Sequence, residues 1–179
     1  MAKKLNSKQL RKTKPASKKD LNYYKNPIVF VLDNVMDTFN IGSFFRLADA
    51  VGAEKVYLCG KTVAPPNIKI HRASVGLWRW VPWEQYQSTE QLIKKLKKDG
   101  YQIIVSELTD KSKNYLELKP KFPVAIVVGH ETTGVSKNVI KLADQQLEIP
   151  MLGVNKSLNV LVAASVIAYR TVALLKIRQ

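Results

Sequence analysis

The sequence predicts an α/β fold in which a parallel sheet carries helices on both faces. Short apolar runs rich in β-branched residues alternate along the chain with helical segments, and this alternation is typical of a doubly wound sheet. The chain has 179 residues, which fits one domain, and 46% of them are hydrophobic, which is enough for a core. Disorder throughout the chain is therefore excluded.

The first predicted elements lie between residues 28 and 60. Residues 28–32 (IVFVL) form an apolar run expected of a buried parallel strand. A helical pattern follows over residues 40–51 and ends at a glycine, which is favoured just after a helix. Residues 55–59 predict a second strand, whereas residues 61–87 show no regular pattern and hold an aromatic cluster. The members of this cluster are Trp78, Trp80, Trp83 and Tyr86.

The alternation resumes in the second half of the chain. Residues 88–98 predict an amphipathic helix with a Ser or Thr cap and a glycine just beyond its end. Further strands are expected at residues 102–106, 124–128 and 147–149, with a short helix from Ser136 to Ala143. A final helix is predicted to open at Ser157 and to run to about residue 177.

This final helix is apolar on nearly all sides from Leu158 to Ala168. A surface helix of a monomer would carry a polar stripe, so burial on several sides is expected. In a domain of this size, a second subunit can supply part of that burial. A homodimer is the simplest expectation.

The chain carries 29 Lys and Arg residues against 14 Asp and Glu residues, a formal net charge of +15. Such an excess indicates a polyanionic partner, because each basic residue placed on a phosphate releases a counterion. Residues 1–25 hold nine of the basic residues and one Asp, so we interpret them as a basic, flexible arm that contacts nucleic acid. The folded domain is then expected at residues 26–179. The candidate contacts in the arm include Lys3, Lys4, Arg11 and Lys12.

Two alternatives to a nucleic-acid arm fit a basic segment of this kind less well. A solubilising tail would have the same composition. An anionic membrane surface is disfavoured because no apolar helical face accompanies the lysines.

Other classes of protein are excluded by what the sequence lacks. The longest strongly apolar stretch, residues 158–169, is interrupted by polar residues and is shorter than the roughly 20 residues that span a bilayer. No apolar segment of a signal peptide follows the Lys-rich N-terminus. The single cysteine, Cys59, excludes an internal disulfide, and one Cys with two His is too few for a structural zinc site. We expect no metal, no membrane association, and a cytoplasmic setting.

The first chemical motif is Asn40-x-Gly42-x-x-x-Arg46, which follows the first strand. Strand-to-helix loops are where α/β folds place ligands. Arg46 lies among apolar neighbours, and a lone guanidinium there is costly unless it meets an anion. The alternative is an arginine that reaches solvent or pairs with Asp49.

The second motif is Gly129-His-Glu131-Thr-Thr-Gly134, which follows the strand at residues 124–128. Glycines here let the backbone approach a ligand closely or adopt a positive φ. Their spacing matches neither the dinucleotide fingerprint nor the P-loop. Glu131 could accept hydrogen bonds from loop amides or contact a substrate, and His130 is interpreted as a loop residue rather than a catalyst.

The third motif spans residues 148–159, where the chain leaves the sheet and turns into the last helix. Ser157 is interpreted as the N-cap of that helix. A functional interpretation adds Asn159, in the first turn beside the free amides and the positive end of the helix dipole.

Together, and in this order, the motifs N-x-G-x-x-x-R, G-x-E-x-x-G and I-P-M-x-G-x-x-x-S-L-N-V-x-x-A resemble those of the SPOUT-class RNA methyltransferases. Within that class the sequence is most similar to the TrmH (SpoU) family, over residues 27–175. The resemblance implies a C-terminal deep trefoil knot, which is rare among proteins, and a homodimer. It also implies S-adenosylmethionine-dependent methylation of a ribose 2′-oxygen in tRNA or rRNA.

The resemblance further implies which residues form the site. S-adenosylmethionine is expected in the knot loops, held mainly by backbone groups and apolar contacts. The matching cofactor positions are Ser106, Gly129, Ile149, Met151, Gly153 and Leu158. The positions implied around the reacting ribose are Arg46, Asn40, Glu131, Ser157 and Asn159. Arg72 and Arg79, together with the arm, are expected to bind RNA near the target nucleotide.

The role of Arg46 is a separate hypothesis. Arg has a pKa above about 12, so a neutral Arg base near pH 7 would be costly. We expect Arg46 to grip a substrate phosphate and to orient the hydroxyl instead.

Two other functions stay open on sequence grounds. The same fold could serve as a catalytically inactive RNA-binding or ribosome-assembly factor, which a cofactor-binding assay would distinguish. It could also methylate a base, although the pair of Asn40 and Arg46 favours ribose. A Rossmann oxidoreductase is disfavoured because its glycine spacing and ribose-binding acid are absent.

Overall fold

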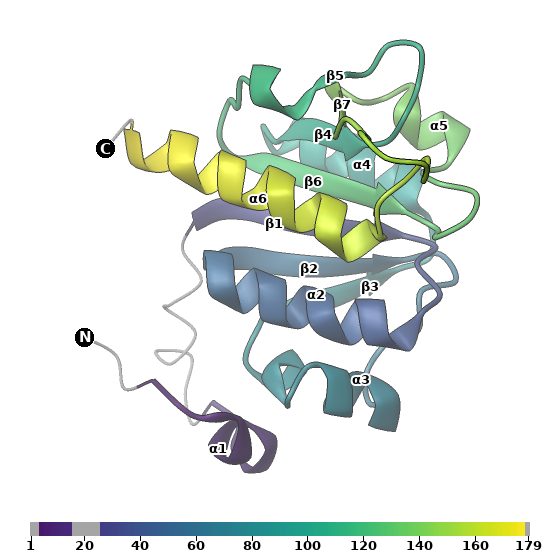
Figure 1. Cartoon of the computed structure of the whole chain (residues 1–179). Coiled ribbons are helices and arrows are strands. Elements are labelled where there is room, and N and C mark those ends of the chain that lie inside the picture. Colours follow the sequence, from purple (N-terminus) through teal and green to yellow (C-terminus); the bar gives the residue numbers. More distant parts are fainter. Residues whose placement is uncertain (1–3, 16–25, 178–179) are drawn as a thin grey trace.

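The computed structural model describes residues 4–15 and 26–177 and has a seven-stranded sheet at its centre (Figure 1). The strand order is β3-β2-β1-β6-β4-β7-β5, and every paired strand is parallel. The strands are β1 (Asn26–Asp33), β2 (Ala53–Cys59), β3 (Trp83–Tyr86), β4 (Gln102–Ser106), β5 (Lys113–Asn114), β6 (Val124–Gly129) and β7 (Gln145–Glu148). The predicted parallel α/β fold is confirmed.

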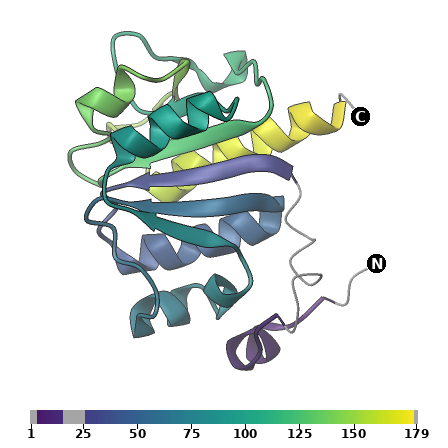
Figure 2. The same cartoon turned by 180° about the vertical axis from the view of Figure 1, so that it is seen from behind.

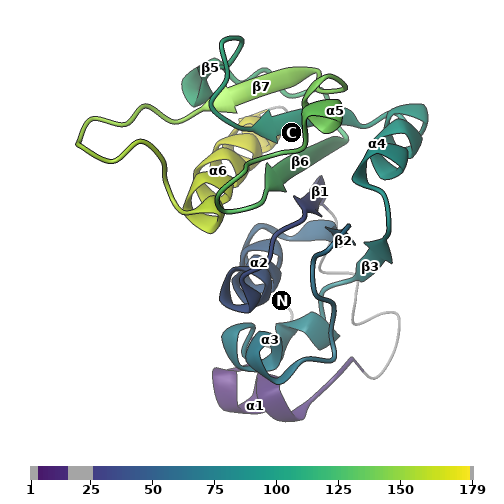
Figure 3. The same ribbon diagram turned by 90° about the vertical axis from the view of Figure 1, so that its right-hand side faces the viewer.

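Helices cover both faces of the sheet (Figures 1 and 2). They are α1 (Ser7–Lys12), α2 (Thr38–Val51), α3 (Ile68–Ala73), α4 (Thr89–Lys98), α5 (Lys137–Ile140) and α6 (Val160–Ile177), with 3-10 turns η2 (Leu77–Arg79) and η3 (Tyr115–Glu117). Seen along the strands, α2 and α6 lie on one side and α4 on the other (Figure 3). None of the helices in the described ranges is long and apolar enough to cross a membrane.

The core has two layers because successive strand side chains point to opposite faces of the sheet. Phe30 and Leu32 pack in the layer shared with α2 and α6, whereas Val29 and Val31 pack in the layer shared with α4 and α5. The central strands β1 and β6 are buried on both faces. This explains why they are continuous apolar runs in the sequence.

Several predicted boundaries move by a few residues. Helix α2 begins at Thr38 rather than at residue 40, because the side chain of Asp37 accepts a hydrogen bond from Phe39 N at 2.7 Å and caps it. It ends at Val51 and is followed by Gly52, whose φ of 62° lies in the left-handed region. The strand expected at residues 147–149 is found at β7, two residues earlier.

The predicted start of the last helix at Ser157 is wrong. Helix α6 begins at Val160, and Asn159 caps it: the side-chain Oδ1 of Asn159 accepts from Leu161 N at 2.9 Å. The Asn159 carbonyl also accepts from Ala163 N at 3.0 Å. Ser157 therefore lies in the connecting loop, where its hydroxyl is not used as a cap.

The structure also contains elements that the sequence pattern did not indicate. Residues 61–87 form α3, η2 and the edge strand β3, and a two-residue strand β5 closes the opposite edge. All are short, and β3 is only partly buried, so neither helical nor strand periodicity could develop. The trefoil knot expected from the family resemblance stays a prediction.

The segment interpreted as a basic arm is only partly described. Residues 4–15 contain α1, and Leu10 packs against the core. Gly76 approaches the backbone of α1 so closely that a side chain there would overlap Leu10 and Arg11. Lys3 and residues 16–25 lie outside the described residues. The proposed domain boundary at residue 26 stays a prediction.

Candidate active site at the carboxyl edge of the sheet

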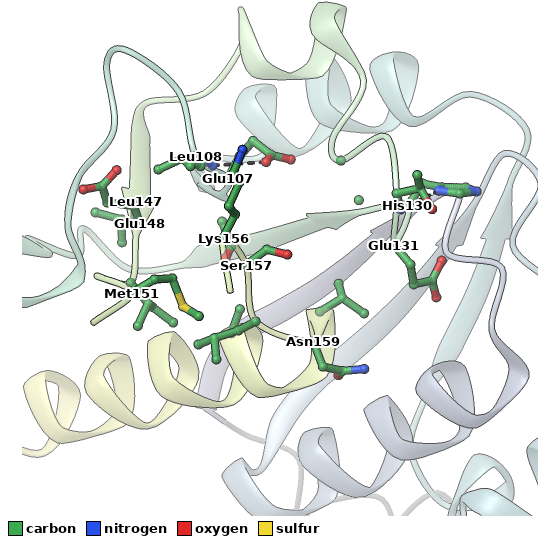
Figure 4. Close-up of a pocket in the computed structure, with 18 of the residues that line it drawn as sticks. Glu107, Leu108, His130, Glu131, Leu147, Glu148, Met151, Lys156, Ser157 and Asn159 are labelled. Carbon is green, nitrogen blue, oxygen red and sulfur yellow. Dashed lines mark hydrogen bonds between the residues drawn. The ribbon is translucent and has the colours of Figure 1, made fainter. Parts of the chain in front are cut away.

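A cavity of about 340 Å³ lies where β4, β6 and β7 end and α6 begins (Figure 4). Parallel strands bring their carboxyl ends to one edge, which is where α/β folds bind ligands. Eight of the predicted site residues line it: Ser106, Gly129, Glu131, Ile149, Met151, Ser157, Leu158 and Asn159. They come from the second and third motifs and from the end of β4, which are far apart in the sequence, and the fold brings them together.

The loop after β6 is compact, and its compactness depends on glycine. His130 and Gly134 exchange two backbone hydrogen bonds of 3.1 and 2.9 Å. A side chain at Gly129 would overlap the backbone of Gly134 and Val135, and Gly134 itself has a φ of 69°. His130 Nδ1 accepts from Thr132 N at 3.0 Å, so this imidazole stabilises the loop.

Glu107 was missed in the sequence although it lines the cavity. Its carboxylate accepts from Val135 N at 2.7 Å and from Leu108 N at 3.1 Å. The side chain thus ties the end of β4 to the loop after β6. Its position directly after a predicted strand, next to Ser106, is the signal that could have found it.

A second carboxylate, Asp33 at the end of β1, holds the other end of the same loop. It is 1% exposed and accepts from Ser136 N at 2.8 Å and from the Thr89 hydroxyl at 2.5 Å. The neighbouring thiol of Cys59 is buried, and burial followed by the charge of Asp33 raises its pKa to about 12. This cysteine therefore stays protonated and is no nucleophile.

Glu131, Asn40 and Asn159 form one hydrogen-bond chain at the mouth of the cavity. Asn40 Nδ2 donates to Glu131 Oε1 at 2.9 Å, and Asn159 Nδ2 donates to Asn40 Oδ1 at 3.1 Å. Asn40 is only 7% exposed. These hydrogen bonds join the start of α2, the loop after β6 and the start of α6 into one unit.

Glu131 also holds the turn before α2. Its carboxylate accepts from Met36 N at 3.2 Å and from Asp37 N at 3.1 Å. Partial burial raises the pKa of Glu131. Hydrogen bonds to its carboxylate outweigh this effect and lower the pKa below 4.5; the donors are the Asn40 side chain and the backbone of Glu131 itself, Met36 and Asp37. Glu131 is therefore ionised at neutral pH and accepts loop amides, one of the two roles considered from the sequence.

The loop between β7 and α6 forms one wall of the cavity. Within the described part of the chain, the backbone groups of residues 151–156 make no hydrogen bonds to one another or to other residues. Leu152 and Val154 point outward and are fully exposed. Gly153, predicted to bind cofactor, lies at this exposed tip and does not line the cavity.

Arg46 does not line the cavity of its own chain. It lies on the exposed side of α2, beyond Asn40 and Gly42 of the same motif. Among residues 4–15 and 26–177, no hydrogen bond or ion pair to its guanidinium is found. The expected RNA contacts that the structure describes are also exposed and lie on α1, α3 and the segments beside them. They are Lys4, Arg11, Lys12, Arg72 and Arg79.

The charge of the cavity favours a cationic ligand. Three carboxylates, of Glu107, Glu131 and Glu148, line it against one ammonium, of Lys156. Its volume lies within the range of about 300–1,000 Å³ that is typical of small-molecule sites. In the parts of the chain that the structure describes, no group of three His, Cys, Asp or Glu side chains is placed to hold a metal.

Comparison with known proteins agrees with this geometry. A sequence model of the SpoU rRNA Methylase family matches residues 27–169. A tRNA (guanosine(18)-2′-O)-methyltransferase of Aquifex aeolicus is 35% identical over 163 residues, which cover 90% of this chain and 73% of that protein. The Escherichia coli K12 protein of the same name is 32% identical and is matched over 77% of this chain and 59% of its own length.

Solved structures show the same relationship. The A. aeolicus TrmH/SpoU tRNA modifying enzyme superposes with a TM-score of 0.77 at 31% identity, over 93% of this chain and 81% of that chain. An AdoMet-bound rRNA methyltransferase of Sinorhizobium meliloti superposes with a TM-score of 0.76 at 27% identity, over 89% of this chain and 58% of that chain. The match of the family model and these likenesses establish that the chain belongs to the SpoU rRNA methylase family.

Proposed function

We propose that this protein transfers a methyl group from S-adenosylmethionine to a ribose 2′-hydroxyl of RNA, with tRNA as the substrate class. The observation that carries the proposal is the cavity at the carboxyl edge, which meets the hydrogen-bond chain of Glu131, Asn40 and Asn159. The names of the A. aeolicus and E. coli relatives support tRNA as the substrate. We place the reaction in the cytoplasm, where tRNA is found.

The residues present fit S-adenosylmethionine. Its sulfonium and ammonium groups suit a cavity lined by three carboxylates, and Lys156 can meet its single carboxylate. The adenine ring fits the apolar wall of Ile149, Met151 and Leu158, with the unpaired backbone groups of residues 151–156 as hydrogen-bond partners. When bound, this cofactor supplies an electrophilic methyl group, so the protein needs mainly to align the acceptor and remove a proton.

The polar side chains at the mouth of the cavity orient the ribose. Asn40 is fixed by Glu131 on one side and Asn159 on the other, so its amide has one orientation. Ser157 and Asn159 both line the cavity, so the hydroxyl of Ser157 and the amide of Asn159 can contact the sugar hydroxyls. A rigid set of donors and acceptors of this kind lowers the barrier by holding the reacting atoms in line.

Arg46 requires a second copy of the chain to reach a cavity. Helices α2 and α6 lie side by side on one face (Figure 1) and carry exposed apolar side chains, Phe39 at 61% and Tyr169 at 55%. A homodimer that buries these side chains brings the partner's Arg46 toward the site. There it holds a phosphate with its planar fork, because neutralising an Arg near pH 7 to make a base would cost about 7–9 kcal/mol.

The test is transfer of labelled methyl from S-adenosylmethionine to unmodified tRNA and, separately, rRNA, with the product digested by alkali. A 2′-O-methyl group blocks cleavage at its nucleotide, so label in an alkali-resistant dinucleotide of tRNA supports the proposal. Label in a mononucleotide would indicate base methylation. Cofactor binding without transfer to either RNA would indicate an RNA-binding or assembly factor.

A further inference from the structure

A second cavity, of about 490 Å³, lies away from the proposed active site. Lys14 and Pro15 form one side of it and residues 78–83 form the other. We call it the tryptophan groove, because Trp78, Trp80 and Trp83, all the tryptophans of the chain, line it.

The groove and the active site lie at different strands of the sheet, the groove beside the edge strand β3 and the active site at β6, β4 and β7. Trp83 is the first residue of β3 and pairs with Val56, in the middle of β2. The active site instead lies beyond the last residues of β4 and β6, at Ser106 and Gly129. A ligand in the groove is therefore not the cofactor or the reacting ribose.

The groove combines aromatic faces with positive charge. Its tryptophans are half-buried, and the guanidinium of Arg79 stacks over the Trp78 ring at 5.2 Å from its centroid. Arg79 also donates to the Arg11 carbonyl at 3.4 Å, which connects the groove to α1. Trp80 Nε1 is buried without a hydrogen-bond partner among the described residues.

A basic surface runs from the groove toward the active site. Residues 4–15 and 55–83 contain no Asp or Glu, and their exposed basic residues include Arg11, Lys12, Lys14, Arg72 and Arg79. Burial and then the charges of Arg79 and Arg11 lower the pKa of His71 below 6.5, as expected in a positive field.

The near end of this surface lies close to the ribose-orienting residues. Gly42, two residues after Asn40, packs so closely on α3 that a side chain there would overlap Ala73. In Figure 3, α1 lies beyond α3 on the side away from α2. The order along the surface is therefore the active site, α3, and then α1 with the groove.

We propose that the tryptophan groove binds an unpaired nucleotide of the RNA substrate at a distance from the methylated nucleotide. A base stacks on the indole faces, and the adjoining phosphates meet Lys14 and Arg79. Stacking platforms flanked by basic residues are the general means of binding single-stranded RNA, because every base has an aromatic face. This proposal rests on the proposed function, since it names which part of the RNA the chain holds besides the target.

The intrinsic fluorescence of the protein tests the proposal directly, because all its tryptophans line the groove. Titration with single-stranded RNA octamers is expected to quench the emission, and a duplex of the same length is expected to quench it much less. The double variant Lys14→Ala, Arg79→Ala is expected to weaken octamer binding about 10-fold or more. It is also expected to reduce the slope of the logarithm of the binding constant against the logarithm of the salt concentration by roughly 1.4, because each of the two lost phosphate contacts contributes about 0.7. The control variant Lys113→Ala, Lys137→Ala removes two exposed lysines elsewhere and is expected to leave binding unchanged.

Methyl transfer to tRNA separates this proposal from the proposed function. The double variant is expected to raise KM with kcat unchanged, because the lost contacts are made equally in the ground and transition states. Equal quenching and equal KM in the double variant and its control would overturn the proposal while leaving methylation intact. Quenching by an acidic peptide but not by RNA would overturn it in favour of a protein partner. Quenching by RNA without any transfer would instead contradict the proposed function.

Discussion

Replacing Glu131 by Gln tests the hydrogen-bond chain at the mouth of the active site. The carboxylate accepts from Asn40 Nδ2, Asp37 N and Met36 N at 2.9, 3.1 and 3.2 Å. Gln keeps one acceptor oxygen, which can serve Asn40 and Asp37. Its amide nitrogen then faces Met36 N, so one hydrogen bond is lost and two donors oppose each other.

The magnitude follows from these contacts. Hydrogen bonds to charged groups contribute about 1.5–3 kcal/mol and neutral ones about 0.5–1.5 kcal/mol, and the site is partly open to water. We therefore expect Glu131→Gln to lower the free energy of unfolding by about 1–2 kcal/mol, or the Tm by roughly 2–8 °C for a chain of this length. We also expect kcat for methyl transfer to fall by up to about 100-fold, because Asn40 loses its fixed orientation.

The pH dependence gives a further check on the same variant. The pKa of Glu131 is held below 4.5 in the folded state. Its contribution to stability is therefore present above about pH 4.5 and is lost as the pH falls through the folded pKa. Urea unfolding from pH 7 down to pH 3 should show the difference between wild type and Glu131→Gln shrinking.

The matched control is Glu117→Gln, since Glu117 is exposed and makes no hydrogen bond or ion pair within the described residues. This control should leave both stability and transfer unchanged. A Glu131→Gln protein as stable and as active as wild type would refute the reasoning. A stability difference that stays constant down to pH 3 would refute the assignment of an ionised carboxylate.

Four further predictions concern other parts of the molecule. Gly129→Ala should cost about 1–3 kcal/mol in urea unfolding, because its methyl group overlaps Gly134 and Val135, whereas Gly153→Ala, in open space, should cost nothing measurable. Arg46→Lys should reduce transfer to tRNA without changing Tm, and near-normal turnover would refute the need for a planar fork. Tyr169→Glu should convert the proposed homodimer to monomers in analytical ultracentrifugation, and an unchanged mass would contradict an α2–α6 interface. Because the pKa of His71 is lowered in the folded state, its imidazole takes up a proton at a higher pH in the unfolded chain than in the folded one. The free energy of unfolding should therefore fall as the pH drops through about 6.5, and His71→Gln should remove this pH dependence.

The sequence predicted the central sheet well, for a physical reason. Strands buried on both faces are continuous apolar runs, and residues 28–32 and 124–128 are of this kind. The edge strand β3 contains Glu84 and Gln85, which are exposed, so no such run marks it. The N-terminus of α6 was misassigned because Ser157 and Asn159 are both good caps, and local sequence cannot decide between them.

The site was predicted less completely than the fold. Motif residues that line the cavity were found because they follow predicted strands or precede the last helix. Glu107 and Asp33 were missed, because their role depends on which loop amides the folded chain brings to them. The exposure of Arg46 was one of two alternatives left open by the sequence, because its apolar sequence neighbours lie on the buried side of α2.

The measurement that tests the central claim most directly is methyl transfer to a tRNA with one 2′-deoxynucleotide at the mapped position. The 2′-hydroxyl is the proposed acceptor, so removing it leaves no oxygen to methylate while the base and phosphates stay in place. We predict that this substitution abolishes transfer, and that a 2′-deoxynucleotide at either neighbouring position leaves most of it. Undiminished transfer to the substituted tRNA would contradict ribose methylation by this protein.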